Sequence, residues 1–199
     1  MSTQNKPAAR IIVFEGADDV GKTTIIQATR DRLRQLNIDA ESIAFPGNEA
    51  GSIGEYIYKI YAGNATACTA AALQALHIAA HVDSVERRLR PLAGFSKIIL
   101  LDRSWWSTLA YGLANGLDEQ FLRLLVSAEL CVWSDIRPNL VIVVSRRDRA
   151  RQVAVEEAYR RLLPEIASVS ELRELQNDQT IDEAVDKVLG FILDEKPRP

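Results

Sequence analysis

The stretch Gly16-Ala17-Asp18-Asp19-Val20-Gly21-Lys22-Thr23 decides the fold of this 199-residue chain. It follows the apolar run 11–14 and precedes a helix-like stretch that begins at Thr24. The glycines allow backbone angles at which consecutive amides turn inward and donate hydrogen bonds to phosphate oxygens at a helix N-terminus. The pattern therefore predicts a phosphate-binding loop (P-loop). Its expected nucleotide-binding residues are Gly16, Ala17, Asp19, Val20, Gly21, Lys22, Thr23 and Thr24.

Two side chains of this loop are candidates for chemistry. Lys22 adds a cation where the phosphates would lie, and electrostatic stabilisation there is what phosphoryl transfer needs. The hydroxyl of Thr23 is of the type that contacts a Mg²⁺ ion bridging two phosphates. We therefore expect a nucleoside triphosphate with Mg²⁺ as the ligand, and Lys22 as a catalytic residue.

Composition limits the remaining function classes. The chain has 24 basic and 27 acidic residues, a net charge of -3 and an isoelectric point near 5.5, so nothing in its overall charge attracts nucleic acid or an anionic membrane. We expect a small-molecule partner, without nucleic acid or membrane. Residues 1–10 are polar and no run of about 18 apolar residues occurs, which favours a cytoplasmic protein. Cys68 and Cys131 are too few for a disulfide framework and are expected to be small buried residues.

Apolar runs alternate with helical patterns along the chain. Runs rich in β-branched residues, each ending in a polar residue, predict buried parallel strands, and apolar residues at three-to-four spacing predict helices between them. This alternation predicts an α/β fold, a doubly wound parallel sheet of about five strands flanked by helices. The expected strands are 11–14, 97–101 and 140–144, with weaker candidates at 40–45 and 171–175, and the expected helices are 24–36, 70–92, 118–132 and 181–193.

The length fits one domain, 10–195, after a flexible N-terminus, 1–9. In such a sheet, ligands bind at the carboxyl ends of the strands. Four features fall there in chain order: the P-loop, Phe45-Pro46, Asp102-Arg103, and an arginine-rich run that starts at Arg146. The last of these predicts a short arginine-bearing lid at about 146–155, unless these arginines only form a solvated helix face.

These features resemble the thymidylate kinase family of nucleoside monophosphate kinases. The resemblance spans about residues 10 to 193, and its specific parts are the P-loop and the Asp-Arg segment. The matching residues are Phe14-Glu15-Gly16 with Asp18, Phe45-Pro46, Arg90-Pro91, Asp102-Arg103 with Ser107, Ala110 and Tyr111, and Arg137-Pro138-Asn139-Leu140.

The resemblance implies a homodimer that uses ATP and Mg²⁺ to phosphorylate a nucleoside 5'-monophosphate. It implies that Asp18 accepts a hydrogen bond from the 3'-hydroxyl of the phosphate acceptor, that Arg103 holds its monophosphate and that Tyr111 lines its sugar. Asp102 would act near Mg²⁺, as a catalytic residue and a metal contact. A lid arginine would stabilise the transferred group, with Arg146 and Arg147 as the first candidates. Further substrate contacts are expected from Phe45, Pro46 and Trp105, the last because one of the two indoles at 105 and 106 would face the pocket, although both could lie in the core.

The chain departs from the family pattern where the family recognises its base. An ungapped match places His77 at a base-stacking phenylalanine and His81 at an arginine that contacts the pyrimidine edge. Gly112 replaces a usual glutamine and Ala44 a usual arginine. Imidazole lacks the paired donors of arginine, so we expect His77 and His81 to contact a base other than thymine. They could instead be ordinary half-buried histidines, or metal ligands, although no third ligand is evident.

Two alternatives to a nucleoside monophosphate kinase remain at this point. The first is a regulatory P-loop protein that binds ATP without turnover. The second is a kinase of a nucleoside or another small metabolite, which the altered base pocket would permit.

Overall fold

Five parallel strands form one sheet in the order β2-β3-β1-β4-β5. The computed structural model describes residues 9–66, 68–147 and 152–193. The P-loop strand β1 lies at the centre of the sheet, which confirms the predicted doubly wound α/β fold. The strands are β1 (Arg10–Glu15), β2 (Ala40–Ala44), β3 (Ile98–Asp102), β4 (Leu140–Ser145) and β5 (Glu171–Gln176).

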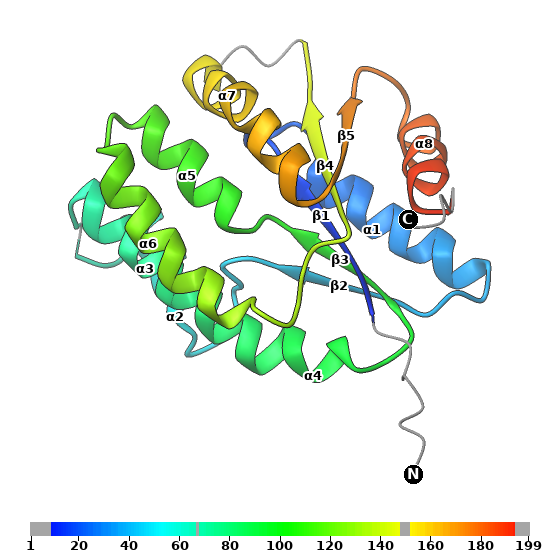
Figure 1. Ribbon diagram of the computed structural model, residues 1–199, viewed down its shortest axis with the longest axis horizontal. Helices are drawn as coiled ribbons and strands as arrows, with labels where there is room; N and C mark the ends of the chain where they lie inside the picture. Colours follow the sequence, from blue (N-terminus) through cyan, green and yellow to red (C-terminus); the bar gives the residue numbers. More distant parts are fainter. Residues whose placement is uncertain (1–8, 67, 148–151, 194–199) are drawn as a thin grey trace.

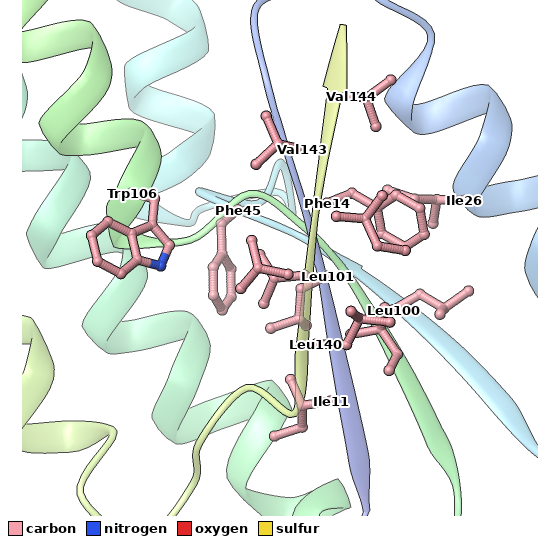
Figure 2. Packing of buried hydrophobic residues seen from close by; sticks show 14 of the residues in the cluster. Ile11, Phe14, Ile26, Phe45, Leu100, Leu101, Trp106, Leu140, Val143 and Val144 are labelled. Carbon is pink, nitrogen blue, oxygen red and sulfur yellow. The ribbon is translucent and has the colours of Figure 1, made fainter. Parts of the chain in front are cut away.

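The central strands are apolar on both faces because helices cover the sheet from both sides. Residues 11–15 of β1 and 140–144 of β4 are all buried. Alternate side chains of a strand point to opposite faces. Figure 2 shows this for Val143 and Val144, which point to opposite sides of the sheet. The continuous apolar runs in the sequence therefore correspond to strands buried on both faces.

Helices α1 (Lys22–Gln35) and α8 (Ile181–Leu193) cover one face of the sheet, and most of the remaining helices lie on the other side (Figure 1). The predicted helix 70–92 is a continuous helical segment of three parts, α3 (Ala70–Ser84), the π-helical turn η1 (Val85–Leu89) and α4 (Arg90–Ala93). The others are α2 (Ile53–Tyr61), α5 (Trp105–Ala114), α6 (Glu119–Val132) and α7 (Val153–Val169).

Helices α2, α5 and α7 were not predicted from periodicity. In α5, seven of ten residues are buried, so the helix has no broad polar face to produce an amphipathic pattern. Helix α7 contains Pro164, a residue that normally indicates a helix end. The expectation for the cysteines was wrong, since Cys68 and Cys131 are both exposed.

Helices α5 and α6 approach each other closely at Gly112. A Cβ atom added there would lie 2.4 Å from Cδ2 and 2.7 Å from Cδ1 of Leu122, a fully buried residue of α6. Packed interiors have little free volume, so even one methyl group requires Leu122 to move. This contact gives a physical reason for the glycine where the family usually has a glutamine.

We expect Gly112→Ala to lower the free energy of unfolding by about 1–3 kcal/mol, because overpacking outweighs the gain in helix propensity. Gly190→Ala is the matched control: Gly190 lies on the exposed side of α8 with nothing within 4 Å of an added Cβ atom. This control should raise stability by up to about 1 kcal/mol. Urea titration of both variants measures the difference, and equal effects at the two positions would contradict the packing argument.

Candidate functional site

The P-loop has the backbone conformation that its glycines permit. Gly16 and Gly21 have φ angles of 135° and 92°, and a Cβ atom on Gly16 would lie 2.2 Å from the carbonyl oxygen of Val144. Asn177, which sequence analysis did not assign, closes the far side of the loop: its Nδ2 donates to the carbonyl of Val20 at 2.8 Å. The loop is therefore held between β4 and the segment after β5.

Lys22, the first residue of α1, lies under the loop. Its Nζ donates to the carbonyl oxygens of Gly16 at 3.0 Å and Ala17 at 2.6 Å. The side chain is nearly buried, and this burial, reinforced by the nearby positive charge of Arg103, lowers the Lys22 pKa to about 8. A cation whose solvation is replaced by two carbonyls gains from an incoming phosphate, as its predicted role requires.

The two predicted Mg²⁺ contacts lie together. The Thr23 hydroxyl donates to Asp102 Oδ2 at 2.6 Å, which brings the N-terminus of α1 next to the end of β3. One carboxylate, one hydroxyl and the phosphates of a nucleotide are the kind of oxygen ligands that Mg²⁺ takes in nucleotide sites. The residues present therefore fit the ion. Among residues 9–66, 68–147 and 152–193, no cluster of three or more histidine, cysteine or acidic residues could hold a metal.

Arg103 connects the P-loop to helix α5. Its guanidinium donates to the carbonyl of Gly16 and to Ser107 Oγ, each at 3.0 Å, and to Tyr111 Oη at 3.1 Å. It also forms an ion pair with Asp18. Burial works to raise the Asp18 pKa, but the charges of Arg103 and Lys22 and the hydrogen bonds of Tyr111 and Gln152 together lower it below its ordinary value. Three of the predicted substrate contacts, at positions 18, 103 and 111, therefore form one connected group.

A buried carboxyl group supports this arrangement from behind. Glu15, at the end of β1, is completely buried and accepts hydrogen bonds from Ser104, Ser107 and Tyr159 at 2.6–2.7 Å. Burial raises the Glu15 pKa, although these three donors and Arg103 work against the shift. Because Ser107 bonds both Glu15 and Arg103, the carboxyl group helps to fix the guanidinium.

A cavity of about 480 Å³ opens beside Asp18 and Arg103. Its volume is in the range of small-molecule sites. It brings together all but one of the predicted substrate contacts. The predicted contacts that line it are Asp18, Phe45, Pro46, His77, His81, Arg103 and Tyr111. The other lining residues had no predicted role in substrate binding: they are Tyr58, Tyr61, Gln74, Ser107, Thr108 and Asn115.

Trp105 is the exception among the predicted substrate contacts. It is 3% exposed, does not line the cavity, and packs edge-on against Trp133 with ring centroids 5.0 Å apart. Trp106 is 2% exposed and packs in the core as well (Figure 2). The interpretation that placed both indoles in the core fits the structure, because α5 presents its first turn to the sheet.

The two histidines lie one helical turn apart on α3 and both line the cavity. His77 Nε2 lies 2.9 Å from Tyr61 Oη, and burial, reinforced by the positive charge of Arg103, lowers the His77 pKa to about 3. His77 is therefore a neutral imidazole at physiological pH. His81 stacks on Phe45 with ring centroids 5.2 Å apart.

The structure describes only part of the predicted lid, because residues 148–151 lie outside the described residues. Arg146 directly follows β4 and is half-buried. Arg147 is exposed and forms an ion pair with Asp178. Gln152 lies inside the predicted lid and had no assigned role; it accepts a hydrogen bond from the Asp18 amide at 3.1 Å, so the residue before α7 contacts the P-loop.

These features define the class of the protein as an α/β P-loop kinase fold. The chain belongs to the thymidylate kinase family, because the family model for thymidylate kinase matches residues 14–177. It is 31% identical over 122 residues to a thymidylate kinase of Pelodictyon phaeoclathratiforme, covering 61% of this chain but only 55% of that relative. It is 29% identical over 190 residues to one of Afipia carboxidovorans, covering 94% of this chain and 80% of that relative.

The fold agrees with that of a solved relative. The crystal structure of thymidylate kinase from Ehrlichia chaffeensis is similar with a TM-score of 0.77 at 19% identity, over 94% of this chain and all of that one. The predicted family and fold class are thereby confirmed. In the described part of this chain, no helix is long and apolar enough to cross a membrane.

The Lys22 environment predicts a pH dependence of stability. Between pH 8 and the ordinary lysine pKa of 10.5, the unfolded chain keeps a proton that the folded protein releases, so stability rises with pH across this window. Without nucleotide, Lys22→Met should therefore be about 1–3 kcal/mol more stable than the unmodified protein at pH 7, and this advantage should vanish near pH 10.5.

Denaturant titration from pH 7 to 10.5 measures this difference. Lys187→Met, which changes an exposed lysine of α8, is the control and should show a difference that does not depend on pH. A Lys22→Met protein that is less stable at every pH would contradict the assigned environment.

Proposed function

We propose that this chain is an ATP-dependent nucleoside monophosphate kinase that moves the γ-phosphate of ATP onto a nucleoside 5'-monophosphate. The main observation in support is that the P-loop and the cavity meet at Asp18, which belongs to the loop and also lines the cavity. A donor bound on the loop and a phosphate acceptor in the cavity would meet there, next to Arg103. Family membership supports the same reaction.

In this reaction, the protein positions two nucleotides and neutralises charge. We propose that Lys22 neutralises charge on the transferred phosphate and that Arg103 binds the monophosphate of the phosphate acceptor, since both cations lie at the junction. Asp18 would accept from the sugar hydroxyl, and Tyr111 would line the sugar. Thr23 and Asp102 would hold Mg²⁺, which when bound neutralises charge on the phosphates.

The lid assignment is a proposal about Arg146 and Arg147. Arg146 follows β4, whose carboxyl end lies beside the P-loop, so its side chain starts close to the site. Arg147 pairs with Asp178 and would have to leave this carboxylate to reach a phosphate. We also propose, on family membership, that the protein acts in the cytoplasm as a homodimer.

Turnover of a monophosphate panel tests the proposed function. Purified protein with ATP and Mg²⁺ should form ADP in the presence of at least one common nucleoside monophosphate. Lys22→Met should lower kcat by at least about a hundredfold, because a removed charge stabiliser of this type costs about 2.7–4 kcal/mol. The variant should remain folded, as judged by circular dichroism. ATP binding without turnover on every monophosphate and nucleoside would instead support the regulatory alternative.

Thymidylate should be a poor substrate, because His81 cannot supply the paired donors of an arginine. Losing such charge-assisted hydrogen bonds costs on the order of 1.5–3 kcal/mol each, which is more than tenfold in selectivity. The measurement is kcat/KM for thymidylate against the other monophosphates, for the unmodified protein and for His81→Arg, which should favour thymidylate. A strong thymidylate preference in the unmodified protein would show that another residue recognises the base.

A further inference from the structure

A buried carboxylate on a neighbouring helix fixes the orientation of His81. Glu129 of α6 is completely buried, and its Oε2 lies 3.0 Å from His81 Nδ1. Its other oxygen, Oε1, accepts a hydrogen bond from Trp133 Nε1 at 3.1 Å. The family resemblance gave no role to Glu129 or Trp133, and the proposed reaction uses neither of them.

The three side chains determine where the imidazole proton lies. An indole N–H can only donate, so Oε1 of Glu129 acts as a hydrogen-bond acceptor. A buried carboxylate is stabilised when both oxygens receive donors, which places a proton on His81 Nδ1. In the neutral imidazole, the other nitrogen is then a hydrogen-bond acceptor.

The second ring nitrogen of His81, Nε2, is the one on the side of the cavity. His81 is 2% exposed and lines the cavity, and its Nδ1 is directed to α6. Within the described residues, Nε2 of His81 makes no hydrogen bond. An acceptor that opens onto the cavity without a protein partner favours a ligand that donates to it.

The other polar groups around His81 do not require a ligand that donates rather than accepts a hydrogen bond. The amides of Gln74 and Asn115 each carry a donor and an acceptor, and the hydroxyl of Thr108 can rotate to serve as either. His77 Nε2 is already paired with Tyr61. Among the histidine, amide and hydroxyl groups at this end of the cavity, His81 is therefore the one whose free hydrogen-bonding atom has its sense fixed by contacts that the structure describes.

We propose that Glu129 is a positioning residue that makes His81 Nε2 a hydrogen-bond acceptor, so that the cavity selects a nucleoside monophosphate whose base presents an amino group, as cytosine and adenine do. A base with a carbonyl oxygen at the same place sets two acceptors against each other and is rejected. The inference rests on the proposed function for its phosphate acceptor, but the state of His81 is measurable without turnover.

The chain contains two histidines, so protein labelled with ¹⁵N in histidine gives only two imidazole spectra. We expect the His81 spectrum of a protonated Nδ1 and an unprotonated Nε2. His81→Phe identifies the signal by its loss. A His81 with a proton on Nε2, whether or not Nδ1 also carries one, would overturn the proposal.

Glu129→Gln should reverse the tautomer. Trp133 Nε1 can only donate, so it keeps the amide oxygen of the new side chain on its side, and the amide nitrogen then faces His81 Nδ1. That ring nitrogen must become the acceptor, which moves the proton to Nε2. Glu119→Gln, an exposed position on the same helix, is the matched control and should leave the His81 spectrum unchanged.

Selectivity is measured by calorimetric binding and by kcat/KM, for deoxycytidylate and adenylate against thymidylate and uridylate. The unmodified protein should favour at least one amino-bearing base by about tenfold or more over both carbonyl-bearing ones. Glu129→Gln should invert the ratio, and His81→Phe should bring it to within about threefold. Glu119→Gln should retain the preference.

The outcomes separate the inference from the proposed function. A protein that binds amino-bearing monophosphates selectively but forms no ADP would contradict the kinase reaction and retain the inference. Turnover without base preference, or a reversed tautomer without a change in preference, would overturn the inference and retain the kinase. If Glu129→Gln does not fold, the histidine spectrum of the unmodified protein and the base selectivities of the unmodified protein and His81→Phe still test the inference.

Discussion

Arg103 is the residue on which the geometry of the site depends. Its amide donates to the carbonyl of Phe14 at 2.9 Å, and its guanidinium donates to the carbonyl of Gly16, so backbone and side chain both tie the end of β3 to the P-loop strand. Its φ angle of 78° lies in the left-handed region, which costs a non-glycine residue about 1–3 kcal/mol. The hydrogen bonds to the loop and α5 offset this strain. This connection fixes the position of the P-loop relative to the cavity that Arg103 lines.

The two halves of the site differ in how closely they follow the family. The P-loop half keeps its glycines, Lys22 and the Thr23–Asp102 contact, because a triphosphate is the same ligand in every such kinase. In the cavity half, by an ungapped match, His77 and His81 stand where the family usually has a phenylalanine and an arginine, and both pack against aromatic rings. On the proposed function, a diverged P-loop kinase would retain its phosphate chemistry while the base that it accepts changes.

The sequence predicted the elements that have a local signal. The strands and the P-loop were recognisable because apolar runs and glycine spacing follow directly from burial and backbone geometry. Tyr58, Gln74 and Glu129 could not have been placed, because their roles depend on contacts between helices distant in sequence. Trp105 was misplaced for a related reason: a strand-to-helix turn was recognisable, but the direction of its first side chains depends on how α5 packs.

The contact between Gly112 and Leu122 constrains how this chain can evolve. Since a Cβ atom at 112 would collide with Leu122, the glutamine usual in the family could return only after position 122 had become smaller. A smaller residue at 122 would first leave a void under α5, and such voids destabilise buried packing. A substitution at 112 or at 122 alone is therefore disfavoured, whereas the two together are expected to be tolerated, so the two positions are epistatic. Because the two positions have to change together, this contact fixes how α5 packs on α6.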